Sequence, residues 1–381
     1  MRGFYRDYLS SLKLSSKYRE LNLVNQDVVL DFSTNDYLGL SKDPRIIESS
    51  YLAAKKYGVG STGSRLLSGN NDLYVEFEKR IAQDKHTEKA VIFNSGFQAN
   101  ISSLACLLDA KVLKVTPLVF FDRLNHASLY QAVSLSKANL IRYHHNNMDH
   151  LKSLLEKYAD SLQPKFIVSE TIFGMDGDIA PLDNLVYLAK KYNSFLYLDE
   201  AHATGVLGDT GYGLGTDLDL SPMQYLVMGT FSKALGASGG YIASSKVICD
   251  YIVNTAQGFI YSTALSPNVI GAALEAWKLI PTFHEVRKEI MSNSALLREK
   301  LAAFGIAAGD STKHIVPIII GAEKRTLEIQ NALLNYGILV SCVRPPTVPP
   351  GSSRLRIAIT AKHSASDIDK LVEALREVLV K

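Results

Sequence analysis

The sequence predicts an α/β fold: a large domain on a mostly parallel central sheet flanked by helices, and a smaller C-terminal α+β domain. Two observations predict it. Short apolar runs recur along the first two thirds of the chain and end in polar or small residues, as buried parallel strands do. After about residue 266, long helical patterns alternate with strands. A chain of 381 residues exceeds one typical domain. We therefore predict an N-terminal segment (1–42), a large domain (43–267) and a small domain (268–381).

Composition argues against several classes of protein. Apolar residues make up 47% of the chain and charged residues 21%, the proportions of an ordinary globular protein. The net charge of +3 indicates no nucleic-acid binding. Cys106, Cys249 and Cys342 have neither disulfide nor metal-site spacing, so we expect no metal and a reducing compartment. No leader-like segment or long apolar run occurs, so we expect a soluble cytoplasmic protein that binds no membrane.

The first seventy residues contain three recognisable segments. Residues 1 to about 30 predict an amphipathic helix and a connector, and a solvated arm fits the same residues. Residues 31–40 (DFSTNDYLGL) indicate a strand that runs into a turn. Residues 57–71 (YGVGSTGSRLLSGNN) form a glycine-rich loop, which either contacts a ligand or simply turns the chain.

A strand, a small-residue turn and a helix follow one another in residues 90–108. The strand covers 90–93, the turn is Asn94-Ser95-Gly96, and the helix begins near Phe97. Free N–H groups and the helix dipole point at such a turn, so Gly96 and Phe97 are candidates to bind a phosphate. The pattern is not a P-loop, and many α/β proteins contain such turns without a ligand.

Two further apolar strands end in polar side chains. His126 lies just past the strand that begins at residue 118, where a loop histidine without function is the alternative. Asp199 and His202 follow the apolar run 195–198. Ligands of open α/β sheets bind at the carboxyl edge of the strands, so both side chains could face one ligand. The alternative for Asp199 is a turn or a helix N-cap.

Lys233 lies in the segment GTFSKALGA (229–237), which follows the apolar run 226–228 and includes Thr230. Burial lowers the pKa of an amine, and a neutral amine forms Schiff bases. A strand-end lysine that reaches solvent is the alternative.

The predicted small domain carries two arginines on one strand. The Pro/Gly-rich loop RPPTVPPGSS leads into Arg354 and Arg356. Alternate residues of a strand share a face, so both side chains could point the same way. A guanidinium there suits a carboxylate, and a surface position is the alternative for each.

One ligand would use all the polar groups at the strand ends: pyridoxal 5'-phosphate (PLP). The amides of Gly96 and Phe97, with the Thr230 hydroxyl, suit its phosphate.

The remaining groups suit the ring and the aldehyde of PLP. His126 can stack on the ring. Asp199 can keep the pyridine nitrogen protonated, so that the ring accepts electrons. His202 can bond the phenolic oxygen, and Lys233 can form the Schiff base with the aldehyde.

At this point the sequence resembles a known family, the α-oxoamine synthases, which are fold-type-I PLP enzymes. The resemblance covers nearly the whole chain. It rests on motifs that occur in this order: FSTNDYLGL, GSTGSRLLSG, SGFQAN, DRLNHASL, MDGDIAPL, DEAHATGVLG, GTFSKALGASGG, YSTALSP and RPPTVPPGSSRLRI.

The resemblance also implies roles for residues outside the strand ends. Asn35 and Arg356 would meet the carboxylate of the amino-acid substrate. Thr347 and Arg19 would lie near the acyl substrate. The family forms homodimers with shared active sites, in which Ser262 and Thr263 would approach the phosphate bound by the partner.

Two residues depart from the family pattern. Gly174 stands where the family usually has serine, and Tyr74 stands where many relatives have histidine. Neither belongs to the lysine chemistry, but each bears on substrate detail.

Within the family, the resemblance implies a decarboxylative condensation of L-alanine with a pimeloyl thioester, carried by acyl carrier protein or CoA. The products would be 8-amino-7-oxononanoate, CO2 and free thiol, in biotin biosynthesis. The alternative in the same family is a glycine C-acetyltransferase, which uses glycine and acetyl-CoA. The sequence also leaves open a transaminase and a non-catalytic binding protein on this fold.

Overall fold

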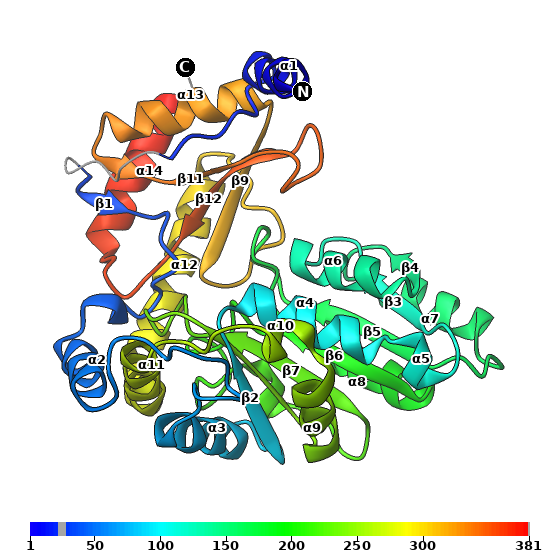
Figure 1. Cartoon of the computed structure of the whole chain (residues 1–381). Coiled ribbons are helices and arrows are strands. Elements are labelled where there is room, and N and C mark those ends of the chain that lie inside the picture. Colours follow the sequence, from blue (N-terminus) through cyan, green and yellow to red (C-terminus); the bar gives the residue numbers. More distant parts are fainter. Residues whose placement is uncertain (22–27, 380–381) are drawn as a thin grey trace. The chain divides into compact units, whose positions relative to one another are not determined.

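The computed structural model describes residues 1–21 and 28–379, and its contacts divide the chain into two compact units (Figure 1). The larger unit contains residues 36–173 and 179–284, and the smaller unit contains residues 1–35, 174–178 and 285–381. Residues 22–27 of the predicted connector, and 380 at the end of the last predicted helix, lie outside the described residues.

This division differs from the predicted domain boundaries. The helix α11 (Pro267–Leu279) packs along α2 (Pro44–Tyr57), so residues 268–284 stay with the larger unit. The segment 174–178 joins the smaller unit although it lies in the middle of the sequence. Both differences arise from long-range packing, which a change in local sequence texture does not reveal.

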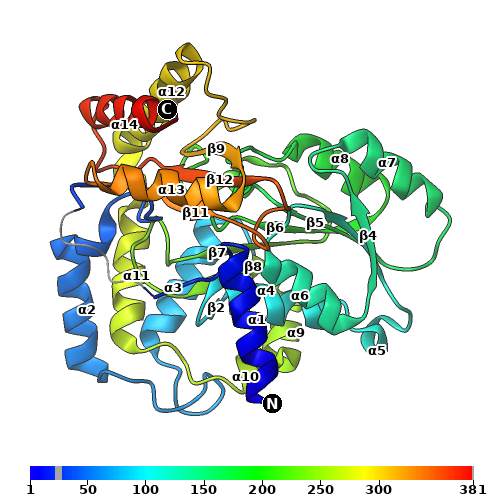
Figure 2. The same cartoon turned by 90° about the horizontal axis from the view of Figure 1, so that it is seen from above.

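The larger unit is built on a sheet of seven strands among the described residues, in the order β2-β8-β7-β6-β5-β3-β4 (Figure 2). Of these seven, only β8 runs against its neighbours, so the sheet is mostly parallel, as the sequence predicts. Its strands are β2 (Lys89–Phe93), β3 (Leu118–Asp122), β4 (Asn139–Tyr143), β5 (Lys165–Glu170), β6 (Ser194–Asp199), β7 (Tyr225–Thr230) and β8 (Gly240–Ser244).

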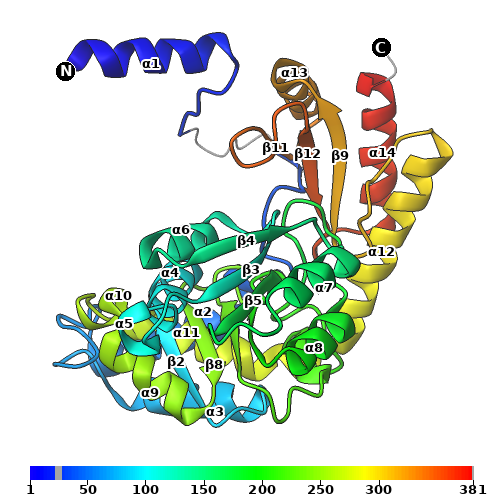
Figure 3. The same ribbon diagram turned by 90° about the vertical axis from the view of Figure 1, so that its right-hand side faces the viewer.

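Helices cover both faces of this sheet, because the apolar residues of each central strand alternate between two cores. In β3, Val119 and Phe121 enter one core, while Leu118 and Phe120 enter the other. The first core receives side chains from α4, α6 and α9, and the second from α7 and α8 (Figure 3). The helices of this unit besides α2 and α11 are α3 (Asp72–Asp84), α4 (Gly96–Leu107), α5 (Ala110–Leu113), α6 (Ala127–Ser136), α7 (Met148–Lys157), α8 (Leu182–Lys191), α9 (Lys246–Thr255) and α10 (Gln257–Ile260), with short 3-10 turns at Leu40–Lys42, Leu214–Asp217 and Ile280–Phe283.

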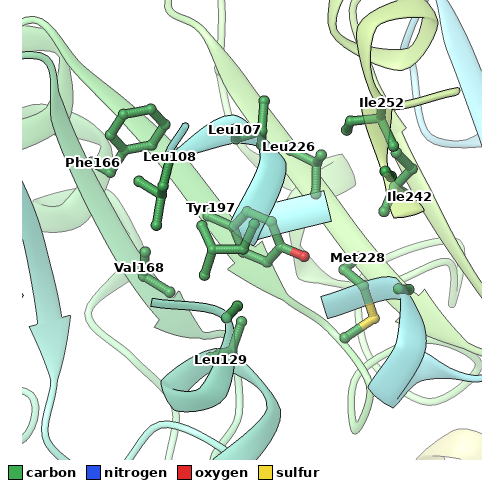
Figure 4. Close-up of a cluster of buried hydrophobic side chains, with 14 of the residues drawn as sticks. Leu107, Leu108, Leu129, Phe166, Val168, Tyr197, Leu226, Met228, Ile242 and Ile252 are labelled. Atoms are coloured by element: carbon green, nitrogen blue, oxygen red, sulfur yellow. The ribbon is translucent and has the colours of Figure 1, made fainter. Parts of the chain in front are cut away.

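The first core places one polar side chain among apolar ones. Tyr197 of β6 packs its ring among Leu107, Val168 and Met228, and its hydroxyl oxygen points toward the side of Met228 (Figure 4). A buried tyrosine of this kind needs a hydrogen-bond partner, and the partner belongs to the site described below.

The smaller unit is an α+β arrangement, as predicted. Its antiparallel sheet has the order β11-β12-β9, and β1 pairs in parallel with β10. The elements are α1 (Arg2–Leu14), β1 (Leu30–Asp31), α12 (His284–Ala303), β9 (Ile315–Gly321), α13 (Glu323–Leu334), β10 (Ile338–Leu339), β11 (Ser341–Val343), β12 (Ser353–Ala358) and α14 (Ala365–Leu379). In the described part of the chain, no helix has both the length and the apolar character to cross a membrane.

Candidate active site

The carboxylate of Asp199 lies at the carboxyl end of β6 and is only 3% exposed. Its Oδ1 accepts a hydrogen bond from the backbone N–H of Ala201 at 2.8 Å, and its Oδ2 accepts one from Asn100 Nδ2 at 2.7 Å. A buried carboxylate remains charged only when such donors replace water. Asp199 therefore has the support that a buried anion needs.

His202 lies in the turn that follows β6, and it is also buried. Its Nδ1 is 2.7 Å from the hydroxyl of Tyr37, a residue in the turn of the DFSTNDYLGL segment. The structure thus holds the imidazole by a contact between residues 165 positions apart in sequence.

The N-terminus of α4 meets the end of β7 closely. Ser95 caps the helix, and its hydroxyl accepts the N–H of Gln98 at 3.0 Å. A Cβ atom on Gly96 would lie 3.3 Å from Thr230 Cβ, so the turn and the strand end are in contact. The Thr230 hydroxyl is 2.7 Å from both the Gly239 carbonyl and the Ser232 hydroxyl. Phe97, the second candidate of this turn, is partly exposed.

His126 is the N-cap of α6. Its Nδ1 lies 2.7 Å from the Ser128 hydroxyl, and its ring meets that of Phe97 edge-on at 6.3 Å between centroids. Desolvation lowers the pKa of His126, Asp199 opposes this effect, and Lys233 adds to it. Asn100, which donates to Asp199, also donates to the Ser128 hydroxyl at 2.9 Å, so hydrogen bonds connect His126 with Asp199.

Lys233 is half-buried in the turn between β7 and β8. Its carbonyl accepts the N–H of Gly236 at 2.9 Å, which closes the turn. Gly236 has φ +63°, and a Cβ there would strike the backbone nitrogen of Ser41 at 2.3 Å. A glycine is therefore required for the lysine turn to pack against the 36–41 segment.

Ser262 and Thr263 lie beside the α4 turn of their own chain. The Ser262 hydroxyl receives a hydrogen bond from Gln98 Nε2 at 2.8 Å, and the Thr263 carbonyl receives one from Asn94 Nδ2 at 2.7 Å. The segment that carries both residues is thus anchored to the candidate phosphate site.

The four predicted substrate-binding residues all belong to the smaller unit and form two pairs. Arg356 on β12 donates through Nη2 to Asn35 Oδ1 at 3.0 Å and through Nε to the Gly174 carbonyl at 2.5 Å. Arg19 donates through Nη2 to the Thr347 hydroxyl at 3.1 Å, and both of these residues are exposed.

Arg354 lies on the same face of β12 as Arg356 but has a different partner. Its guanidinium pairs with the Asp176 carboxylate, and it is buried. This arginine is therefore part of the internal structure of the smaller unit.

Comparison with known proteins identifies the family. Residues 27–375 match the model of the family described as aminotransferase class I and II. The 8-amino-7-oxononanoate synthase of Gluconacetobacter diazotrophicus is 43% identical over 351 residues, which cover 92% of this chain and 87% of that protein. The chain belongs to the α-oxoamine synthases of this aminotransferase family.

Solved structures of α-oxoamine synthases agree with the fold. A serine palmitoyltransferase from S. paucimobilis, solved with a PLP adduct, has a TM-score of 0.89 at 28% identity and covers 99% of this chain and 98% of its own. The 8-amino-7-oxononanoate synthase from Francisella tularensis has a TM-score of 0.76 at 26% identity and covers 93% of this chain and 99% of its own. The fold-type-I prediction is confirmed.

The two departures from the α-oxoamine synthase pattern have structural roles here. Gly174 presents its backbone carbonyl to Arg356. Tyr74 is buried, donates its hydroxyl to the Leu265 carbonyl at 3.0 Å, and lies under the Arg65 guanidinium at 3.7 Å from the ring centroid.

Sequence reasoning missed the residues of this α-oxoamine synthase that support the predicted groups. They are Tyr37, Asn100, Ser128, Tyr197 and Ser232. Asn100 could have been predicted, because it lies four residues after Gly96 and therefore on the same face of the helix as the candidate phosphate turn. The others have no local pattern that sets them apart.

Proposed function

We propose that the chain is a PLP-dependent acyltransferase that condenses L-alanine with a pimeloyl thioester and releases CO2 and free thiol. The product is 8-amino-7-oxononanoate, a precursor of biotin. The observation that carries the proposal is the set of hydrogen bonds that joins His126 to the buried Asp199 through Ser128 and Asn100. The choice of substrates is supported by the name of the G. diazotrophicus relative, at 43% identity.

The residues of the larger unit fit PLP. A phosphate needs backbone donors at a helix N-terminus, and α4 begins at Gly96 in close contact with Thr230. A pyridinium nitrogen needs a charged acceptor, and Asp199 is a buried carboxylate held by two donors. The aldehyde of PLP forms a Schiff base with an amine, and the half-buried Lys233 lies in the turn between β7 and β8.

Several side chains would hold this cofactor. Asp199 would accept the hydrogen of the pyridine nitrogen, His202 would bond the phenolic oxygen, and the ring of His126 would lie against the pyridine face. Gly96, Phe97 and Thr230 would bind the phosphate, with Ser262 and Thr263 reaching the phosphate of a partner in a homodimer. When bound, PLP supplies a protonated ring that accepts the electron pair left on the amino-acid Cα.

The chain's own residues then supply positioning and proton transfer. Arg356 and Asn35 bind the carboxylate of alanine, which fixes the amino acid at one end. The amine of Lys233 removes the Cα proton and later returns it. The imidazole of His126 donates a hydrogen bond to the thioester oxygen as negative charge develops there, an effect that can contribute several kcal/mol.

Arg19 and Thr347 complete the proposed substrate set at the acyl end. Their hydrogen bond joins the segment after α1 to the loop before β12. A guanidinium and a hydroxyl offer donors to the terminal carboxylate or the carbonyl of a pimeloyl chain.

A substrate panel tests the proposal. The PLP-loaded protein is mixed with L-alanine, glycine or L-serine, each with a pimeloyl or an acetyl thioester, and free thiol is measured. We expect release with alanine and pimeloyl thioester. Preference for glycine and acetyl thioester would reassign the protein to the glycine C-acetyltransferases. Thiol release with no pair would refute the condensation, and a keto-acid product without a thioester would indicate a transaminase. The thioester of acyl carrier protein and that of CoA are compared in the same assay.

A further inference from the structure

Five polar side chains of the larger unit form one continuous chain of hydrogen bonds. Tyr197 Oη lies 2.9 Å from Asn100 Oδ1, and Asn100 Nδ2 lies 2.7 Å from Asp199 Oδ2 and 2.9 Å from Ser128 Oγ. Ser128 Oγ lies 2.7 Å from His126 Nδ1. Tyr197, Asn100 and Ser128 are each at most 1% exposed, so water does not replace these partners.

The direction of every hydrogen bond in this chain can be assigned. The Asp199 carboxylate accepts only, so the Asn100 amide turns its NH2 toward it and its oxygen toward Tyr197, which donates. The same NH2 group donates its second hydrogen to Ser128 Oγ. The Ser128 hydroxyl then has its own hydrogen left to donate.

That hydrogen goes to the imidazole. The backbone N–H of Ser128 also points at His126 Nδ1, at 3.3 Å, so Nδ1 faces two donors and, among the described residues, no acceptor. A ring nitrogen in this position must present its lone pair. The proton of the neutral imidazole is therefore on Nε2.

We propose that Asn100 is a positioning residue, which holds the Asp199 carboxylate and, as a donor to Ser128, supports the His126 tautomer with its proton on Nε2. One amide thus orients two groups to which the proposed function gives separate tasks. The catalytic consequence rests on that proposed function, whereas the tautomer assignment does not.

The consequence for the proposed reaction concerns the donor on His126. An Nε2–H is the hydrogen that His126 can offer to a developing oxyanion, and the other tautomer would present a lone pair at Nε2 instead. Both oxygens of Asp199 have a donor on the protein side, from Ala201 and Asn100, which fixes the plane of the carboxylate. The Asp199 carboxylate, which only accepts, keeps the amide from flipping, and Tyr197 donates to the amide oxygen in this orientation.

Two substitutions of Asn100 by side chains of nearly the same size distinguish the positioning role of the amide from a role in packing alone. Asn100→Asp places a second carboxylate beside Asp199, and two such groups share one proton. The Ser128 hydroxyl then faces an acceptor and donates to it, so its lone pair turns to His126 Nδ1. This contact, at 2.7 Å, is closer than the backbone N–H of Ser128 at 3.3 Å, so we expect Nδ1 to carry a proton. Asn100→Leu removes the amide but leaves Ser128 free to donate to Nδ1.

Nitrogen NMR of 15N-histidine-labelled, cofactor-free protein at about pH 8 tests the proposal. The His126 signals are assigned by their loss in His126→Gln. We expect an unprotonated Nδ1 in the wild type and in Asn100→Leu, and a protonated Nδ1 in Asn100→Asp. A protonated Nδ1 in the wild type, or an unchanged spectrum in Asn100→Asp, would overturn the assignment.

A kinetic measurement tests the consequence on the loaded enzyme. We expect Asn100→Leu to lower kcat by about 10- to 100-fold, the size typical of residues that orient catalytic groups from behind, with little change in KM. Thermal melts of each variant exclude global unfolding. An unchanged kcat in Asn100→Leu would remove the positioning role even if the tautomer is as assigned. If the wild type releases no thiol while the tautomers follow the prediction, the proposed function fails and the tautomer assignment stands.

Discussion

At the scale of single residues, buried polar groups of this chain have hydrogen-bond partners on the protein that replace water. Asp199 keeps two hydrogen-bond donors although it is almost inaccessible. His363, in the smaller unit, is a second example. It stacks on Phe32 at 4.0 Å, its Nδ1 accepts the N–H of Thr360 at 3.0 Å, and its Nε2 lies 3.1 Å from the Asp31 carbonyl. We therefore expect a change of charge at Asp199 to change the reaction rate, and a change of charge at His363 to change the free energy of unfolding.

Asp199→Asn tests the role of the charge at the end of β6. The amide is close in size to the carboxylate but carries no charge, and its NH2 group would face the N–H of Ala201 or the NH2 of Asn100. We expect the variant to bind PLP and to release thiol about 100-fold more slowly or worse, the size of a lost acid–base contribution. The measurement is thiol release at saturating substrates. Asp219→Asn, at an exposed carboxylate that pairs with Lys190, is the matched control, and a normal rate in Asp199→Asn would refute the role.

His363 makes stability depend on pH in a defined direction. Burial lowers the pKa of His363 below its usual 6.5, against the opposing effect of the Asp31 carbonyl. The folded state therefore binds this proton less readily than the unfolded state, so the contribution is complete above about pH 6.5 and is lost as pH falls through the folded-state pKa. We expect urea unfolding to give a free energy that falls below pH 6.5, and less steeply in His363→Gln. His86→Asn, at an exposed histidine, should keep the wild-type slope, and equal slopes in all three proteins would contradict the prediction.

At the scale of elements, a buried ion pair ties helix α3 of the larger unit to the end of strand β6. Lys85, at the end of α3, pairs with Glu200, the residue after β6, and both side chains are at most 1% exposed. The Lys85 amine also donates to the Tyr212 carbonyl at 2.7 Å, and Glu200 accepts the N–H of Gly215 at 2.6 Å. The pair therefore anchors the segment that begins directly after Asp199.

Lys85→Met leaves the Glu200 carboxylate buried without its partner. We expect the free energy of unfolding to fall by about 3–5 kcal/mol, the usual effect of breaking a buried pair. Lys85→Met combined with Glu200→Gln should recover part of this loss, because no charge is then left unpaired. Urea denaturation measures both. Lys246→Met, which breaks an exposed i,i+4 pair with Asp250, should lower the free energy of unfolding far less, because solvent screens that pair. Equal losses in Lys85→Met and Lys246→Met would show that burial of the pair is irrelevant.

The contact between β8 and the start of α4 has no room for a side chain at Gly240. A Cβ there would lie 2.7 Å from the Gly96 nitrogen and 2.9 Å from the Ser95 carbonyl carbon, both backbone atoms. We expect Gly240→Ala to displace the proposed phosphate site, to weaken PLP binding in an absorbance titration, and to cost about 1–3 kcal/mol of stability. Gly60→Ala, whose Cβ would meet no atom of the described chain within 4 Å, is the control. Unchanged PLP affinity in Gly240→Ala would argue against a phosphate at this turn.

At the scale of the whole molecule, the proposed homodimer has a candidate surface in the larger unit. The glycine-rich loop and the segment after α10 are joined by the bridge between Ser64 and Thr263. They expose large apolar side chains, among them Leu67 at 85% and Tyr261 at 81%. Exposed apolar side chains gathered at one place are typical of a protein interface.

Leu67→Asp should shift the protein from dimer to monomer in sedimentation at micromolar concentration, because a carboxylate in an apolar interface loses its water without a partner. Leu162→Asp carries the same change at an equally exposed leucine that lines a groove at the amino ends of β5 and β6, and it should remain a dimer. A monomeric wild type, or dissociation of both variants, would contradict the choice of surface.

The sequence by itself determined the fold class and the family, and it predicted the strand ends at which the candidate site lies. Apolar runs of three or four residues, followed by Gly96, His126, Asp199 or Lys233, are local patterns. The carboxyl ends of parallel strands necessarily share an edge. The helix α2 was not predicted, although Asp43 and Pro44 form its N-terminal cap and first residue. This Asp-Pro capping pattern is local, so the start of α2 could have been predicted from the sequence.

Only the tertiary structure decided which groups support the site. Asn100 reaches Asp199 across 99 positions, Tyr37 reaches His202 across 165, and Lys85 reaches Glu200 across 115. It also decided that α11 belongs to the larger unit and that Arg354 is bound internally by Asp176. Such pairs depend on strand order and helix packing, so no local spacing in the sequence encodes them. The role of a buried polar residue can be assigned only when its hydrogen-bond or ion-pair partner is known.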